Sequence, residues 1–279
     1  MNESIPIPGS WKALRRFTAA RIATGRAGGS LPTAEVLHFG LDHAVARDAV
    51  HAELDLDMLE AALAPLKLPV IRVQSCAPDR LTYLQRPDLG RRLDPASRSR
   101  LEQAASLVSA KPKKNAQSPG IVIALADGLS AAATQAHAAG LLGELLPRLR
   151  RANLQPGPLV IVRQGRVAIQ DEIGQALGAK SALILLGERP GLAAADSLGA
   201  YFVFAPRVGN TDAQRNCVSN IRPAGLPLVA AAETLEYLIL ESLRRKLSGP
   251  TLKDERQLNA PEHGRLSPPE NEAAKAAED

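Results

Sequence analysis

From residue 70 onward, short apolar runs alternate with segments in which apolar residues recur every three or four positions. A short continuous apolar run between turn residues is typical of a buried strand, whereas the longer spacing is typical of a helix. Continuous apolar strands that alternate with helices predict a parallel sheet with both faces covered. We therefore expect an α/β fold with a Rossmann-like sheet, and strands at VIRVQS (70–75), IVIALA (121–126), LVIVRQGRV (159–167, ending at Gly165), SALILLGE (181–188) and AYFVFAP (200–206).

Three helices are expected to cover this sheet. One follows Gly128, one spans AIQDEIGQALGA (168–179), and one spans 228–247, where Gly249-Pro250 is a normal helix stop. We expect the sheet and its helices to form a domain over 70–250.

The first part of the chain has helical periodicity and no strand pattern. After the GRAGGSLP break (25–32), Thr33 is a plausible N-cap of a second helix. Apolar residues then recur at spacings of three and four and predict one apolar face, formed by Leu37, Leu41, Ala44, Val45 and Ala49. These features predict a small N-terminal helical domain over residues 1–69.

Residues 251–279 differ in composition from the rest of the chain. They contain eleven charged residues and three prolines but no aromatic residue. Such a segment cannot bury enough apolar surface to offset its ordering entropy, so we expect a disordered tail. Its net charge of −3 leaves a charge near +8 on the rest of the chain.

The overall composition narrows the possible functions. The chain has 279 residues, a net charge of +5 and 45% hydrophobic residues, but only 3% aromatic residues. The positive charge suits nucleic acid or an acidic partner subunit, yet the few aromatics offer no base-stacking platform. The two cysteines form no disulfide framework, and no apolar run is long enough to span a membrane. We therefore expect a cytoplasmic protein that binds neither membranes nor nucleic acid.

Familiar catalytic motifs are missing from the sequence. It contains no G-x-G-x-x-G after a strand, no phosphate-binding P-loop, no G-x-S-x-G elbow and no His/Cys group at metal-ligand spacing. The three histidines at 38, 43 and 51 are more often surface or structural residues than ligands. A free-standing nucleotide-dependent enzyme and a basic nucleic-acid adaptor are thus the weaker hypotheses.

Polar groups instead gather where the predicted strands end. Three such interruptions contain glycine: 127–130 (DGLS), 163–167 (RQGRV) and 187–191 (GERPG). Ligands bind outside the carboxyl ends of strands in open parallel sheets, and glycine lets the backbone approach them. Each group also has a structural alternative: Asp127 could cap its helix, Glu188 could pair with a nearby Arg, and Cys217 could be a small buried residue.

Six blocks of the sequence, in order, closely resemble the small subunit of ethanolamine ammonia-lyase, from about residue 10 to residue 250. They are ARIATGRAGGSLPTAEVLHFGLDHAVARDAV, YLQRPDLGRRL, ADGLS, GERPGLAAADSLGAYFVFAPR, RNCVSNIRPAGLP and RRKLSG. The resemblance implies an adenosylcobalamin (coenzyme B12) enzyme that converts ethanolamine to acetaldehyde and ammonia. A separate large subunit would contain the substrate pocket, and this chain would enclose the other side of the coenzyme in a hetero-oligomer of paired chains. A related amino-alcohol lyase with another substrate is the alternative.

The resemblance also implies which residues contact the coenzyme. Glu188 matches the family's contacting Glu, Val167 its contacting Val through a backbone N–H at a helix start, and Cys217 its contacting Cys; Arg166 is a weaker candidate. No catalytic acid or base and no metal ligand is expected in this chain.

Two departures from cobalamin proteins bear on these expectations. The D-x-H-x-x-G motif, in which a protein His replaces the lower base of the cofactor, is missing, since Asp42 and His43 are adjacent. The family suggests packaging in a bacterial microcompartment, but helical sequence begins by about residue 11. The N-terminal extension associated with packaging is therefore expected to be missing. The expected location is a bacterial microcompartment by family resemblance, and otherwise the cytoplasm.

Overall fold

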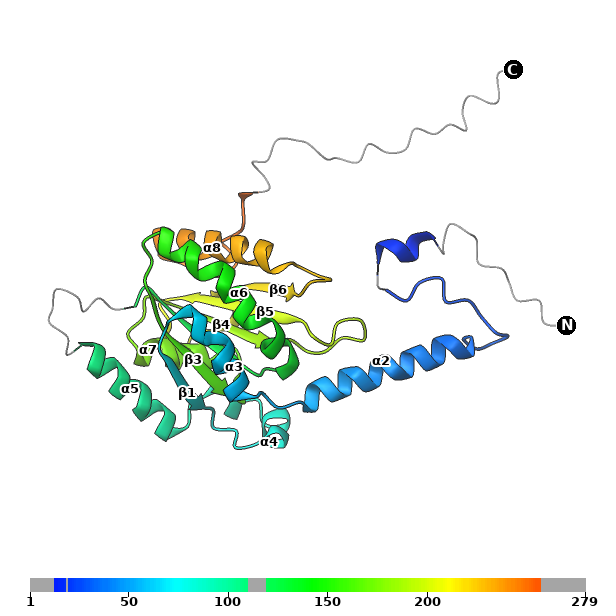
Figure 1. The fold of residues 1–279 in the computed structure, drawn as a ribbon, viewed down its shortest axis with the longest axis horizontal. Coiled ribbons are helices and arrows are strands. Elements are labelled where there is room, and N and C mark those ends of the chain that lie inside the picture. Colours follow the sequence, from blue (N-terminus) through cyan, green and yellow to red (C-terminus); the bar gives the residue numbers. More distant parts are fainter. Residues whose placement is uncertain (1–12, 19, 110–118, 257–279) are drawn as a thin grey trace, which may run out of the picture.

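The computed structural model describes residues 13–18, 20–109 and 119–256. Its centre is a six-stranded sheet in the order β1-β3-β2-β4-β5-β6 (Figure 1). The strands are β1 (Val70–Gln74), β2 (Ile121–Ala126), β3 (Pro156–Arg163), β4 (Ser181–Gly187), β5 (Leu198–Phe204) and β6 (Arg215–Ile221). The described helices are α2 (Thr33–His51), α3 (Leu56–Leu63), α4 (Arg80–Gln85), α5 (Pro95–Ser109), α6 (Ala131–Arg151), α7 (Ile169–Ala176) and α8 (Leu228–Arg245).

The α/β class and all five predicted strands are confirmed, but the sheet is mixed. Strands β1 to β4 pair in parallel, whereas β5 is antiparallel to β4 and β6 is antiparallel to β5. The prediction of a parallel sheet was therefore wrong for β5, and β6, which is also antiparallel to its neighbour, was not predicted. Only residues 188–197 connect β4 to β5, too few for the crossover that a parallel pair requires. The Rossmann-like description stays a prediction.

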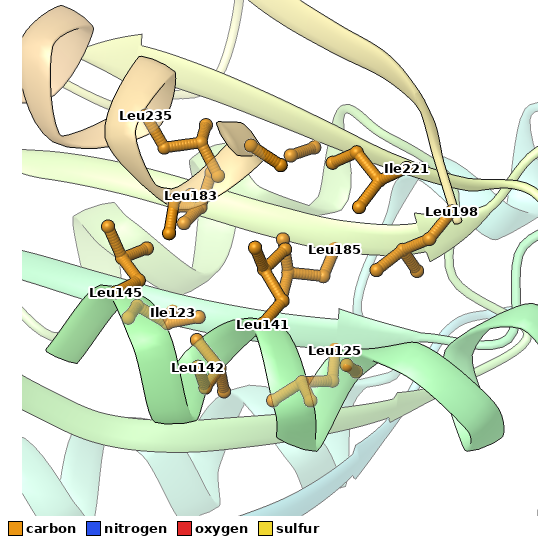
Figure 2. Packing of buried hydrophobic residues seen from close by; sticks show 14 of the residues in the cluster. Ile123, Leu125, Leu141, Leu142, Leu145, Leu183, Leu185, Leu198, Ile221 and Leu235 are labelled. Atoms are coloured by element: carbon orange, nitrogen blue, oxygen red, sulfur yellow. The ribbon is translucent and has the colours of Figure 1, made fainter. Parts of the chain in front are cut away.

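Two apolar cores cover the two faces of the sheet. On one face, Leu183 and Leu185 of β4 pack with residues of α6 and α8 (Figure 2). Residues of α3 belong to the same core. On the other face, Ala182, Ile184 and Leu186 pack with residues of α5 and α7. Because successive side chains of a strand point to opposite faces, the unbroken apolar run of β4 supplies both cores.

The segment before the sheet contributes little to either core until α3. Leu59 and Leu63 of α3 are fully buried in the same core as the sheet. In α2, by contrast, Ala49 is the one buried residue. The boundary at residue 69 stays a prediction, although α3, which precedes it, packs on the sheet.

Two local predictions were wrong. Thr33 does not cap α2: it is already helical, and Pro32 occupies the N-cap position without a side-chain bond. The predicted tail starts too early, because Leu252 is buried against the core next to α8. The five apolar residues predicted to share one face do lie on α2, and the structure adds that they are exposed, apart from Ala49 and the half-buried Ala44. The rest of the predicted tail, 257–279, lies outside the described residues.

Candidate functional site

A pocket of about 480 Å³ opens at the carboxyl edge of the parallel strands. The loops after β2, β3 and β4 meet there, and α4 and β5 complete the wall. The site thus lies where ligands usually bind in open α/β sheets. The lining residues are Tyr83, Leu129, Arg166, Val167, Leu186, Gly187, Glu188, Arg189 and Tyr201.

Glu188 lies at the end of β4 with one carboxylate oxygen engaged. Its Oε2 accepts hydrogen bonds from Ser197 Oγ at 2.5 Å and from the backbone N–H of Asn220 at 3.1 Å. Neither contact is an ion pair, so the alternative of a salt bridge to a nearby Arg finds no support among the described residues. Within the same part of the chain, Oε1 accepts no hydrogen bond. The fixed carboxylate therefore has one oxygen available to a donor in the pocket.

Val167 reaches the same pocket from the β3–α7 loop. The neighbouring N–H of Arg166 donates to Gly90 O at 2.8 Å, and that of Ile169 donates to Arg166 O at 3.0 Å. Among the described residues, the Val167 N–H has no such partner, because it precedes the first turn of α7. The structure thus brings Val167 and Glu188 together, with a free donor on one and a free acceptor on the other.

Tyr83 forms part of the pocket wall between two guanidinium groups. Arg166 Cζ lies 4.4 Å and Arg80 Cζ lies 4.8 Å from the centre of its ring. Burial raises the pKa of Tyr83 to about 12, with the two arginine charges acting in the opposite direction, so the phenol stays neutral. Tyr83 and Tyr201 were not predicted as site residues from the sequence. The signal available was the scarcity of aromatic residues, which makes each one near a strand end notable.

Cys217 does not line the pocket. It lies on β6 opposite Tyr201 of β5, which does line it, and it is exposed rather than buried. Desolvation by the surrounding protein atoms raises the pKa of the Cys217 thiol, and the negative charge of Glu188 raises it further. A neutral thiol thus borders the pocket one strand away. The alternative of a small buried Cys217 is wrong.

Asp127 organises the loops behind the pocket and does not cap α6. Ser130 is the N-cap, and its side chain accepts from Ala133 N. Asp127 instead accepts hydrogen bonds from the N–H groups of Gln164 (2.9 Å) and Gly165 (3.1 Å). The alternative that Asp127 caps its helix is therefore wrong. Asp127 instead joins the loop after β2 to the loop after β3.

Two glycines allow the pocket floor to form. Gly128 has φ of +58°, and a Cβ there would lie 2.2 Å from Gly187 O. A Cβ on Gly187 would lie 1.9 Å from Ser130 O. The Leu129 N–H donates to Gly187 O at 2.9 Å. Any side chain at either position would separate the loop after β2 from the end of β4.

The pocket is lined by apolar, aromatic and charged side chains together with one glycine. Its nine lining residues include no serine, cysteine or histidine that could act with a base as a nucleophile. In the described ranges, no three His, Cys, Asp or Glu side chains are grouped to bind a metal, and His38, His43 and His51 are exposed. In that same part of the chain, no helix combines the length and apolar character of a membrane span. The structure is thus that of an α/β protein with an open pocket at the carboxyl edge of its parallel strands.

Comparison with known proteins identifies the family. Residues 8–253 match the family model described as ethanolamine ammonia-lyase light chain (EutC). A protein described as ethanolamine ammonia-lyase small subunit, from Azotobacter vinelandii, is 52% identical over 248 residues, which cover 89% of each chain. Proteins with the same description from Rhodopseudomonas palustris and Ralstonia nicotianae are 48% and 49% identical, covering 93% and 91% of this chain and 96% and 92% of theirs. The chain belongs to the family of ethanolamine ammonia-lyase small subunits.

Proposed function

We propose that this chain holds one side of adenosylcobalamin in an ethanolamine ammonia-lyase formed with a large subunit. The observation that supports this most strongly is the pairing of a free backbone donor at Val167 with a free carboxylate oxygen at Glu188 in one pocket. The corrin ring of the coenzyme is mainly apolar and is fringed by amide side chains. A primary amide presents N–H donors and a carbonyl acceptor, so this pair of groups is complementary to it.

The residues present fit such a ligand in three respects. Glu188 Oε1 would accept from an amide N–H, a charge-assisted bond that contributes about 1.5–3 kcal/mol. The Val167 N–H would donate to an amide carbonyl. Leu129 and Leu186 would contact apolar parts of the ring. The buried Nε of Arg166 has no partner among the described residues and is a further donor in the pocket wall.

The role of this chain is to bind and orient the coenzyme. When bound, adenosylcobalamin supplies a carbon-centred radical by homolysis of its cobalt–carbon bond, and the conversion of ethanolamine to acetaldehyde and ammonia depends on it. The lining residues of this pocket include no acid–base pair for that conversion. We therefore assign the groups that contact the substrate to the large subunit, which would also decide between ethanolamine and another amino alcohol.

Cys217, paired with the pocket residue Tyr201, extends the proposed binding surface beyond the pocket. Both lie on the antiparallel part of the sheet, and their side chains share one face in register. The exposed neutral thiol would contact the coenzyme through its small size and polarisability. The assignment of Cys217 rests more on the family resemblance than that of Val167 or Glu188.

Replacing Val167 by proline is expected to weaken coenzyme binding more than replacing it by alanine. Both variants lose side-chain contacts, but proline also removes the N–H, whose net hydrogen bond is worth about 1 kcal/mol, or roughly fivefold in Kd. Because this N–H has no internal partner in the described structure, the proline variant loses no hydrogen bond of the fold. Titration of the assembled pair with adenosylcobalamin measures both affinities. Equal Kd values for the two variants would show that the N–H is not used.

A further inference from the structure

Helix α2 presents large apolar side chains to solvent along most of its length. Figure 1 shows it extending away from the sheet and its covering helices. Leu37, Leu41 and Val45 are 67%, 63% and 49% exposed, and their spacing of four places them along one side of the helix. Val36 and Phe39, 52% and 46% exposed, lie on other sides. A helix that is apolar on several sides is normally buried.

The preceding segment covers only part of α2. Arg21 pairs with Asp42 at 2.5 Å, and its guanidinium lies 4.7 Å from the centre of the Phe39 ring. Arg15 pairs with Glu35 at 3.1 Å. These contacts involve the side of the helix that contains Phe39. The side formed by Leu37, Leu41 and Val45, which we call the α2 stripe, remains exposed.

The C-terminal end of α2 is fastened to the loops of the coenzyme pocket. Arg80 donates from Nε to Val50 O at 2.7 Å and from Nη1 to Gly128 O at 2.8 Å. Glu53, just after the helix, pairs with Arg163 at the end of β3 at 3.7 Å. The helix therefore leaves the molecule from the edge of the sheet where the pocket opens.

From this placement we infer that the α2 stripe is a docking surface for the large subunit. The inference rests on the proposed function, because the chain that covers the open pocket must lie beside the point where α2 leaves the molecule. A second copy of this chain that contributed only its own α2 would cover one side and leave Val36 exposed. A large partner with a groove can surround several sides of the helix.

The test uses the full chain, coexpressed with a tagged large subunit and purified without coenzyme. The double variant Leu37→Glu/Leu41→Glu puts charges on the stripe while keeping good helix formers. Matched controls are Met58→Glu on α3 and Val208→Glu after β5, at positions that are 61% and 60% exposed. We expect the double variant to weaken assembly at least tenfold, while the controls assemble like the unaltered chain. Circular dichroism and Tm of the isolated chain should stay unchanged, since both leucines are exposed.

Several outcomes would overturn the inference. The double variant could assemble as tightly as the unaltered chain, or the controls could lose as much affinity as the double variant. The isolated chain could also sediment as a dimer that the double variant splits, which would assign the stripe to a second copy.

The milder variant Leu37→Ala/Leu41→Ala should weaken assembly in the same direction but by a smaller factor. Because assembly is measured without coenzyme, a failure of the coenzyme proposal would appear separately, as unchanged coenzyme affinity in pocket variants of the assembled pair.

Discussion

Replacing Arg215 by methionine is expected to lower the free energy of unfolding by about 3–5 kcal/mol, because it leaves a buried carboxylate without its partner. Arg215 Nη1 and Nη2 donate to Asp171 Oδ1 and Oδ2 at 3.0 and 2.7 Å. The two side chains are only 2% and 4% exposed. Urea denaturation of the isolated chain measures the loss.

The double variant Arg215→Met/Asp171→Leu removes both charges. It therefore separates the effect of losing the ion pair from the cost of leaving the Asp171 carboxylate buried without a partner. Replacing a whole buried ion pair by apolar residues is often neutral, so the double variant should recover most of the stability. A single variant within 1 kcal/mol of the unaltered chain would contradict the prediction. So would a double variant that is less stable than the single one.

The effect of Arg215→Met should also depend on pH. Burial raises the pKa of Asp171 even beside Arg215, whose charge opposes the increase, and removing that charge raises the pKa further. A carboxyl with a higher pKa in the folded state than in the unfolded state loses stability as the pH rises through the folded pKa. The difference in free energy of unfolding between Arg215→Met and the unaltered chain should therefore become smaller as the pH falls from 7 toward the ordinary pKa of Asp.

This ion pair also matters for the site. Asp171 lies in the first turn of α7, four residues after Val167, and Arg215 lies on β6, two residues before Cys217. The pair thus joins the two segments that contain these proposed coenzyme contacts. Loss of stability at this point should accompany weaker coenzyme binding.

Replacing Glu188 by alanine is expected to raise the Kd for adenosylcobalamin about 10- to 100-fold without preventing assembly. The physical reason is the loss of a charge-assisted hydrogen bond of about 1.5–3 kcal/mol from Oε1. Glu188→Gln keeps a neutral acceptor and should lose about half as much binding free energy. Spectrophotometric titration of the assembled pair gives the Kd values, and sedimentation gives the assembly state.

Glu144→Ala is the matched control for Glu188, since Glu144 is an exposed residue of α6 outside the pocket. It should bind coenzyme like the unaltered chain. An unchanged Kd in Glu188→Ala would remove Glu188 from the proposed site. A loss of assembly in that variant would instead make Glu188 part of the subunit interface.

The parallel half of the fold could be predicted from the sequence because its strands are continuous apolar runs. The run at 181–187, buried along its whole length, is the clearest case. Strand β6 escaped prediction because RNCVSNI is mostly polar and has only Val218 and Ile221 as buried apolar residues. The antiparallel pairing of β4 and β5 could have been predicted from the length of their connection, because residues 188–197 are too few for a crossover helix.

The sequence predicted less of the candidate site than of the fold. Strand ends located Glu188 and Val167 correctly at one edge, because carboxyl ends of parallel strands converge. Arg80 contacts Tyr83 from the same helix, but the contact of Tyr83 with Arg166 joins residues 83 positions apart, which periodicity does not reveal. The exposure of α2 was also hidden, because an apolar stripe looks the same whether it packs in its own chain or against another.

The most direct test of the central claim is reconstitution of the lyase from separate chains. This chain alone, the large subunit alone and the two together would each receive adenosylcobalamin and ethanolamine, and acetaldehyde would be followed. We expect acetaldehyde only from the pair, and a lower coenzyme affinity when the pair contains Glu188→Ala. Activity of either chain alone at the level of the pair would contradict the claim that this chain completes the coenzyme site.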